Sequence, residues 1–323
     1  MVSAVVEWFD VNARDLPWRR PECSPWGVLV SEVMLQQTPV ARVEPVWREW
    51  MLRWPNPADL AGATQADAVR AWGRLGYPRR AQRLWECARA IVERHGGTLP
   101  GDTGLRDPGP GHTGRGDSGP GDSGPGGEAD GADAKRGEAE LLALPGIGDY
   151  TAAAVRAFAF GESSVVLDTN IRRVIGRAWH GRALPAAHLT RPEREFAASL
   201  LPSDPARAVV WSAGSMELGA LVCTARVARC EECPLAPWCA WLAAGKPGLE
   251  EAPRRTQAWH GTDRQVRGRI LAVLRDASAP VNVTGLAVLK DVDPGQLDRC
   301  IGSLVEDRLV ALADAQRGAY VLG

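Results

Sequence analysis

The sequence predicts a mainly α-helical protein of two or three domains. Apolar residues recur at helical spacing over residues 1–99 and again over 138–222, whereas strand-like alternation is scarce. At 323 residues the chain is long enough for several hydrophobic cores, and 45% hydrophobic with 24% charged residues is ordinary for a soluble globular protein. No apolar stretch approaches the roughly 20 residues that span a bilayer, so we expect a cytoplasmic protein without membrane contact.

The first helical region covers residues 1 to 99. Its apolar spacing predicts five helices, within the stretches VVEWFDVNA, WGVLVSEVMLQQT, VARVEPVWREWMLRW, QADAVRAWGRL and RRAQRLWECARAIVERH. The next tract, residues 101–137, loses this pattern, because 13 Gly and 4 Pro make up 17 of its 37 residues. Too few apolar side chains remain to offset the entropy of ordering it, so we expect a disordered insertion over 101–137.

Helical spacing resumes at Glu138. It continues through EAELLALPGIGDYTAAAVRAFAF, VVLDTNIRRVIGRAWH, REFAASLL and ARAVVWSAGSMELGALVC. A Pro-containing linker over 243–262 then leads to a separate C-terminal piece. Three helical patterns and a hairpin pattern over 263–323 predict a small winged-helix-like domain, which either binds DNA or packs on its neighbour.

Charge gives little information about a partner. The formal net charge of −1 does not indicate a polyanionic ligand. Arginine pairs such as Arg79-Arg80 and Arg172-Arg173 are compatible with phosphate contacts and equally with solvated helix faces. The sequence leaves both interpretations open.

Four of the seven cysteines lie within 17 residues, at Cys223, Cys230, Cys233 and Cys239. A cytosolic chain does not rely on disulfides, so this group predicts a metal site. Four thiolates hold either a zinc ion or a 4Fe–4S cluster. One CxxC pair flanked by single cysteines favours iron–sulfur over zinc, and the loop over 223–239 is expected to have a structural role.

Two carboxylates stand out because of their surroundings. Glu32 interrupts the apolar run WGVLVSEVMLQQT, so it lies on or beside a buried helix face. It is either a helix-edge residue in a salt bridge or a group put to chemical use. Asp168 follows an apolar run and precedes a helical one, which predicts an N-cap. A capping carboxylate can still present one edge to a cleft.

The stretch LPGIGDYTAAAV contains two glycines, Gly146 and Gly148, in front of a helix that starts near Asp149. Glycines allow a tight turn and a close approach of the backbone to a partner. The helix start directs backbone N–H groups and the positive end of the helix dipole the same way. Such a turn either grips a DNA phosphate without reading sequence or simply joins two helices.

Together, SEVMLQQT, LPGIGDYTA, VLDTNIRRV, MELGALVC and the spaced cysteines resemble, in this order, the helix-hairpin-helix DNA glycosylases. Within that superfamily they are similar to the MutY-type adenine DNA glycosylases. The resemblance covers roughly residues 4–242 without the Gly/Pro-rich tract. It implies a catalytic region over 1–242 with two helical subdomains, and Glu32 and Asp168 on opposite walls of a cleft.

The resemblance also implies an activity, namely hydrolysis of the N-glycosidic bond of adenine mispaired with 8-oxoguanine or guanine, in base excision repair. Glu32 matches the general acid that protonates adenine N7, and Asp168 matches the carboxylate that supports the cationic sugar. Asn170 matches a residue near the catalytic water. Tyr150 stands where strand-cleaving relatives carry a lysine, so AP-lyase activity is expected to be weak or absent.

Other family positions also match. Arg14, Trp18 and Glu217 match the adenine pocket, and the positions matching DNA contacts are Gln36, Gln37, Tyr77, Gly146, Gly148 and Thr151. The implied cofactors are a 4Fe–4S cluster on the four cysteines and a monovalent cation at the hairpin turn. The expected partner is double-stranded DNA with A:8-oxoguanine or A:G mispairs, bound by a monomer in the nucleoid; downstream repair partners are not identifiable.

Two departures from the family pattern affect damage recognition. Pro78 stands where many members carry a second tyrosine beside the lesion, and residues after Cys239 do not resemble the Nudix-like domain that reads 8-oxoguanine. The alternatives are a thymine or uracil glycosylase for G mismatches, whose usual LRRT-like sequence differs from LQQT, and a non-catalytic iron–sulfur DNA-binding protein.

Overall fold

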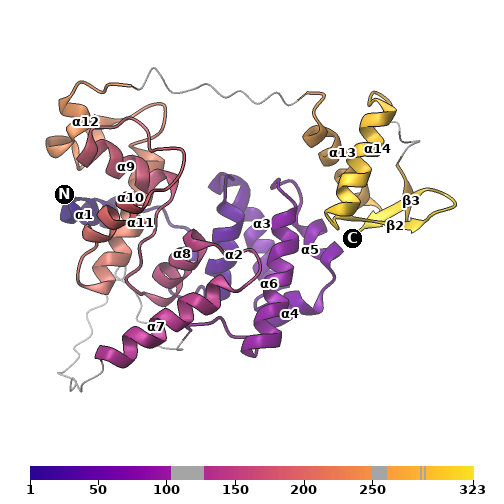
Figure 1. Ribbon diagram of the computed structural model, residues 1–323, viewed down its shortest axis with the longest axis horizontal. Helices are drawn as coiled ribbons and strands as arrows, with labels where there is room; N and C mark the ends of the chain where they lie inside the picture. The colour runs from indigo at the N-terminus through magenta and orange to yellow at the C-terminus, as the bar shows by residue number, and fades with distance from the viewer. Residues whose placement is uncertain (103–126, 249–259, 284–285, 287–288) are drawn as a thin grey trace. The chain divides into compact units, whose positions relative to one another are not determined.

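The computed structural model describes residues 1–102, 127–248, 260–283, 286 and 289–323. The predicted mainly helical fold is confirmed (Figure 1). The chain divides into two compact units, each built from three segments: residues 1–29, 99–143 and 147–254 form unit 1, and residues 30–98, 144–146 and 255–323 form unit 2. The predicted boundaries at 242 and 263 stay predictions, and linker residues 249–259 lie outside the described ranges.

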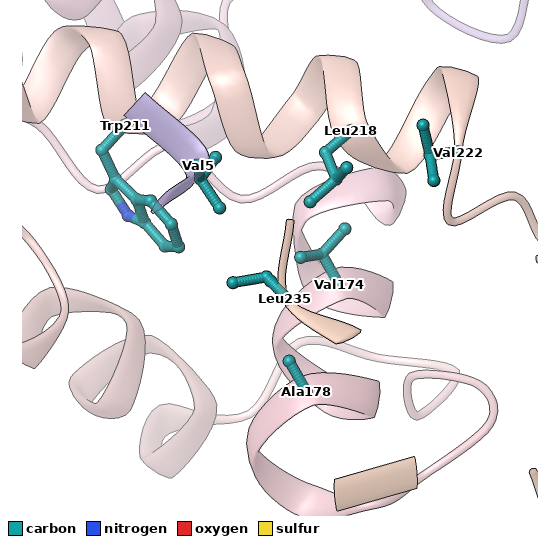
Figure 2. Close-up of a cluster of buried hydrophobic side chains, with 7 residues drawn as sticks. All are labelled: Val5, Val174, Ala178, Trp211, Leu218, Val222 and Leu235. Atoms are coloured by element: carbon teal, nitrogen blue, oxygen red, sulfur yellow. The ribbon is translucent and has the colours of Figure 1, made fainter. Parts of the chain in front are cut away.

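Unit 1 is formed by the N-terminal helix and most of the helices after residue 126. Its elements are α1 (Val2–Asn12), η1 (Pro17–Arg19), the first part of α2 (Pro25–Leu35), α7 (Gly127–Leu142), α8 (Asp149–Phe160), α9 (Thr169–His180), α10 (Arg191–Ser199), α11 (Pro205–Leu221), η2 (Cys230–Glu232), η3 (Ala236–Trp238) and α12 (Ala240–Ala243). Helix α11 packs against both α1 and α9. Figure 2 shows the core they share, with Val5, Val174, Trp211 and Leu218 buried together.

Unit 2 contains the end of α2 and a layer of helices around α6. Its elements are α3 (Val40–Arg53), α4 (Pro57–Gly62), α5 (Gln65–Trp72), α6 (Arg79–His95), α13 (Asp263–Asp276), β1 (Val281–Asn282), α14 (Pro294–Glu306), β2 (Val310–Asp314) and β3 (Ala319–Leu322). Helix α6 packs against α4 and α5. Trp50 and Trp72 are at most 1% exposed and contact each other edge to face, so these tryptophans serve the core.

Local sequence explains where several of these helices begin. Thr64 and Asp67 form a capping box at the start of α5, in which each side chain accepts the other residue's backbone N–H. Asn56 caps α4 and Asp204 caps α11, and in both helices Pro occupies the first turn, where it lacks an N–H that would need a partner. These starts are therefore set by short polar motifs as well as by apolar spacing.

The structure differs from the predicted disordered tract at the C-terminal end of that tract. Helix α7 begins at Gly127, so residues 127–137 are helical, while 103–126 lie outside the described residues. Residues 127–137 include three alanines with Glu128, Lys135 and Arg136, residue types that favour helices. Arg136 also pairs with Glu140 one turn on. Glycine content alone predicts disorder over the whole tract, whereas residues 127–137 belong to the helix that continues to Leu142.

The C-terminal elements agree with the expected module in most respects. The predicted helices over 264–277 and 295–310 are present as α13 and α14, and the predicted hairpin is β2 and β3. Strand β1 adds to this hairpin in an antiparallel sheet of order β1-β3-β2. Half of the third predicted helix, over 283–290, lies outside the described ranges, and its described residues are not α-helical.

Candidate functional site

Glu32 lies in the middle of α2, which spans the boundary between the units, and its side chain is only 6% exposed. Leu29, Val30 and Met34 on the same helix have no exposed surface. A carboxyl group removed from water in this way is costly unless it is paired or put to use. Glu32 is therefore a buried group rather than an exposed residue on the edge of its helix.

The segment after α2 and the segment before α6 hold three residues predicted to contact DNA. Gln36 is half-buried, and Gln37 is exposed with φ of 55°. Tyr77 is 44% exposed with φ of 48°. Left-handed backbone is unfavourable for residues other than glycine and concentrates at functional sites. Gln37 and Tyr77 are two of the four such residues in the described part of the chain.

The glycine-rich turn has the predicted geometry. Gly146 has φ of 81°, and a Cβ built on it lies 2.9 Å from the Cβ of Arg83, so both the backbone angle and the contact require glycine. Helix α8 begins at Asp149 with Gly148 at its N-cap, a position that supplies no side-chain cap. Both glycines are exposed, whereas Thr151 is 2% exposed. The exposed helix start suits an anion.

Asp168 caps α9, which confirms the sequence prediction. Its Oδ1 accepts the backbone N–H of Ile171 at 2.7 Å, and its Oδ2 accepts the side-chain amide of Asn170 at 2.7 Å. Burial raises the pKa of Asp168, although these hydrogen bonds and the charge of Arg173 act in the opposite direction. The carboxylate is thus held in one orientation in a largely dry environment.

Arg173 supports this carboxylate through Asn170. It donates to the Oδ1 of Asn170 at 2.7 Å, to the carbonyl oxygen of Gly219 at 2.6 Å and to that of Cys223 at 2.7 Å. Arg173 is 5% exposed, so the Arg172-Arg173 pair is not a solvated face, and Arg172 in turn pairs with Glu193. The sequence analysis missed this role, because nothing local distinguishes a buried arginine from an exposed one.

A close approach of α11 to α9 also fixes the first turn of α9, which contains Asn170. A Cβ added to Gly219 of α11 would lie 2.7 Å from the Cβ and 2.8 Å from the carbonyl oxygen of Asn170. Such contacts are far shorter than the ordinary 3.5–4.0 Å between carbon atoms. The backbone of α11 therefore reaches the first turn of α9 only because residue 219 is glycine.

The predicted adenine-pocket residues come together in unit 1. Glu217 is 1% exposed and accepts hydrogen bonds from Arg14 at 2.6 and 2.8 Å and from Arg19 at 2.9 Å. Burial alone would raise the pKa of Glu217, but the two arginines outweigh it and hold the pKa at about 2. Trp18 is 6% exposed in the short helix η1 beside Arg19. Arg19 is a further member that the sequence analysis did not identify.

The cysteine loop follows α11 and lies against the core of unit 1. The four cysteines line one pocket, together with Val222, Ala228, Arg229, Ala236, Trp241 and Leu242. Leu235, between the cysteines, is 1% exposed and inserts into the cluster shown in Figure 2. Arg177 approaches the Sγ of Cys223 at 3.4 Å and donates to the carbonyl oxygen of Thr224 at 2.8 Å.

Thiol ionisation in this loop depends on burial. Burial raises the pKa of Cys233 to about 11, and it raises the pKa of Cys223 against the opposing effect of Arg177. Among the described residues, no group of three or more His, Cys, Asp or Glu is arranged to hold a single metal ion. The four thiols nevertheless line one shared pocket.

The structure thus gathers two sets of predicted residues. Unit 2 contains Glu32, Gln36, Gln37 and Tyr77. Unit 1 contains the predicted adenine-pocket residues, Asp168 with its partner Asn170, and the cysteine loop. Each set is described within its own unit, and the cleft with Glu32 and Asp168 on opposite walls stays a prediction. No helix in the described ranges is long and apolar enough to span a membrane.

Comparisons with known proteins show the family of the chain. A family model described as HhH-GPD superfamily base excision DNA repair protein matches residues 30–196. The chain is 47% identical to an adenine DNA glycosylase of Mycolicibacterium smegmatis, covering 95% of this chain and 91% of that protein. It is 45% identical to an adenine DNA glycosylase of Mycobacterium tuberculosis, covering 95% and 88%.

A solved structure with a similar fold is that of a thermostable thymine-DNA glycosylase. It has a TM-score of 0.58 and 25% identity, and the match covers 75% of this chain and 95% of that one. Fold, motif order and sequence identity over nearly the whole length therefore agree. The chain belongs to the HhH-GPD superfamily of base excision DNA repair proteins and, within it, to the family of the adenine DNA glycosylases.

Proposed function

We propose that this protein is a monofunctional DNA glycosylase that removes adenine mispaired with 8-oxoguanine or guanine. The observation that carries the proposal is a pair of carboxyl groups in different environments, Glu32 buried in an apolar helix and Asp168 held by directed hydrogen bonds. Glycosidic bond cleavage requires one carboxyl group that gives a proton and one that stays ionised. Membership of the adenine DNA glycosylase family supports adenine as the leaving base.

In the proposed reaction Glu32 gives its proton to N7 of the extruded adenine. The base becomes a better leaving group, the bond between C1′ and N9 breaks, and both bonding electrons leave with adenine. The carboxylate of Glu32 then takes a proton from the water that attacks C1′. This restores the acid and leaves an abasic site, so protons and electrons balance without any further reagent.

Asp168 supports the positive charge that develops on the sugar in this step. Its two oxygen atoms are already oriented by Ile171 and Asn170, so little reorganisation is needed when the charge appears. The buried surroundings that raise its pKa also strengthen its attraction for a cation. Arg173 donates a hydrogen bond to Asn170 and so helps to hold Asn170 against Asp168.

The group of Glu217, Arg14 and Arg19 is proposed to form one side of the adenine pocket. Adenine presents both donors and acceptors on its edges, so a carboxylate held between guanidinium groups offers both kinds of partner. Trp18, buried beside Arg19, supplies an aromatic surface for stacking. Gln37, Tyr77 and the turn at Gly146 and Gly148 are proposed to contact the duplex while the base is extruded.

Tyr150 lies in the first turn of α8 at the proposed catalytic face. A phenol forms no Schiff base with an abasic sugar, whereas a lysine amine does. We therefore propose that the enzyme releases the base by hydrolysis and leaves the strand intact. A monovalent cation at the hairpin turn belongs to the same proposal and would act by drawing a phosphate toward the backbone.

The cysteine loop is proposed to hold a 4Fe–4S cluster with a structural role. Four thiols around one pocket fit a group with four iron corners, and one CxxC pair flanked by single cysteines favours iron–sulfur over zinc. Cys223, Cys230, Cys233 and Cys239 would bind as thiolates, stabilised by Arg177 beside Cys223. Purified protein should be brown and absorb near roughly 400 nm; a colourless protein that contains zinc would overturn the assignment.

The experiment that tests the proposed function is single-turnover base release from a panel of duplexes. The panel pairs adenine with 8-oxoguanine, guanine or thymine, and includes thymine and uracil opposite guanine. Fast release of adenine opposite 8-oxoguanine or guanine, without strand cleavage, supports the proposal. Release of thymine or uracil alone would support the G-mismatch alternative, because a thymine-DNA glycosylase has a similar fold. Tight binding without release of any base would support the non-catalytic alternative.

A further inference from the structure

Arg80, in the first turn of α6, reaches the end of the helix that carries Glu32. Its Nη1 lies 3.0 Å from the carbonyl oxygen of Val33, 3.1 Å from that of Met34 and 2.6 Å from that of Gln36. These are carbonyls at the C-terminal end of α2, where the helix itself supplies no donor. A guanidinium at this position satisfies them and places a positive charge at the negative end of the helix dipole.

The same side chain also holds the second segment predicted to contact DNA. Its Nη2 donates to the Oγ1 of Thr38 at 3.1 Å and to the carbonyl oxygen of Gly76 at 3.2 Å. Its guanidinium carbon lies 5.4 Å from the ring centroid of Tyr77 and 5.2 Å from that of Trp72. Arg80 therefore joins the loop after α2 to the loop before α6.

Both loops adopt unfavourable backbone angles at their exposed residues. Gln37 has φ of 55° and Tyr77 has φ of 48°, and such angles persist only where surrounding contacts enforce them. The contacts of Arg80 lie on Gln36 and Thr38, on either side of Gln37, and on Gly76, immediately before Tyr77. One guanidinium thus fixes the backbone around both strained residues.

We propose that Arg80 is a positioning residue that preorganises Gln37 and Tyr77 for insertion beside the mispair and fixes the end of the Glu32 helix. The inference rests on the proposed function for its substrate. It differs from both interpretations that the sequence allowed for Arg79-Arg80, because the Arg80 guanidinium donates its hydrogen bonds to oxygen atoms of the chain itself. Lysine would keep the charge but lacks the planar fork of donors that spans the two loops.

The test compares Arg80→Lys and Arg80→Met with Ile91→Ala, a matched control. Ile91 lies on the same helix, has no exposed surface and does not contact either loop through a hydrogen-bonding side chain. The first measurement is amide hydrogen exchange of the free protein over residues 33–39 and 76–80. Exchange there should be at least tenfold faster in Arg80→Met and intermediate in Arg80→Lys, and unchanged in Ile91→Ala despite a lower melting temperature.

The second measurement is binding to a duplex with 2′-fluoro-2′-deoxyadenosine opposite 8-oxoguanine, which resists cleavage, and to a fully paired duplex. Arg80→Met should weaken mispair binding at least tenfold and leave paired-duplex binding within twofold, so that discrimination is lost. Arg80→Lys should retain part of the discrimination between the two duplexes, and Ile91→Ala should discriminate like the wild type. Weaker mispair binding in Ile91→Ala as well would show that general destabilisation accounts for the effect and would overturn the inference.

The two measurements separate the inference from the proposed function. Wild-type exchange rates in Arg80→Met would overturn the positioning role whatever the substrate is. Fast exchange with unchanged mispair binding would show that the ordered loops do not serve mispair recognition and would also overturn it. A wild type that does not discriminate between the two duplexes would instead contradict the proposed function, while the exchange result would still decide whether Arg80 orders the loops.

Discussion

Replacing Gly219 with alanine tests whether the contact between α11 and α9 positions Asp168, the proposed catalytic carboxylate. The added Cβ would meet the Cβ of Asn170 at 2.7 Å and its carbonyl oxygen at 2.8 Å. Ordinary carbon–carbon contact is about 3.5–4.0 Å, so the first turn of α9 must move by about 1 Å. Asp168 and its partner Asn170 lie in that turn and must move with it.

Two effects of Gly219→Ala follow from this displacement. Overpacking of this kind destabilises a fold by about 1–3 kcal/mol. A shift of about 1 Å in a catalytic group costs on the order of 100-fold in rate. We therefore expect a lower free energy of unfolding in urea and single-turnover adenine release slowed about 100-fold at a temperature where the variant is folded.

Gly176→Ala is the matched control, because it makes the same change within α9 itself. A Cβ at Gly176 meets only the carbonyl oxygen of Arg182, at an ordinary 3.7 Å. Alanine in a helix interior is favoured over glycine by roughly 0.5–1 kcal/mol, so this variant should be as stable as the wild type or more so, with an unchanged rate. Wild-type values of both the free energy of unfolding and the rate of adenine release in Gly219→Ala would show that this contact does not position Asp168.

Three further predictions concern charge and chemistry. Asp168→Asn should abolish adenine release and change stability at pH 7 by no more than about 1 kcal/mol, because relief from burying a carboxylate whose pKa burial raises offsets the lost hydrogen bond from Asn170, while asparagine still caps α9; a much larger loss in thermal melts would contradict this. Glu217→Gln should cost up to about 3 kcal/mol in urea melts at pH 7, from the lowering of the Glu217 pKa from 4.5 to about 2. Because that pKa is lowered on folding, the stabilisation is complete above about pH 4.5 and lost as the pH falls through about 2, so the gap between Glu217→Gln and wild type should close on acidification. Tyr150→Lys should gain a borohydride-trappable covalent complex with abasic DNA that the wild type lacks; equal trapping of the wild type would show that the hydrolytic assignment is wrong.

Local patterns predicted those parts of the structure that depend on local physics. Apolar spacing predicted most of the helices but missed the short helix α4, and a polar residue predicted the start of α9 at Asp168. The turn at Gly146 followed from glycine's access to positive φ. The disorder prediction was wrong over residues 127–137, because their glycine content hides the helix that begins at Gly127, and it stays a prediction for residues 103–126, which lie outside the described ranges.

The parts that sequence analysis missed depend on contacts between distant segments. Arg80 binds carbonyls 44 to 47 residues away, and Arg173 binds carbonyls 46 and 50 residues away. Each arginine lies in a polar-looking stretch, where an exposed position is the usual outcome. The local sequence pattern around each arginine does not indicate that carbonyl oxygens of a distant segment lie within reach of its guanidinium. The same reasoning applies to Gly219, because a glycine inside a helix reveals its purpose only when the neighbouring helix is in place.

The most direct test of the central claim is the behaviour of Glu32→Gln on DNA with adenine opposite 8-oxoguanine. Glutamine matches the shape of Glu32 but has no acidic proton to give to adenine N7. The account predicts that this variant folds, binds the mispaired duplex within a few-fold of the wild type and releases no measurable adenine in a single turnover. Adenine release at near the wild-type rate would contradict the assignment of Glu32 as the acid and, with it, the proposed mechanism.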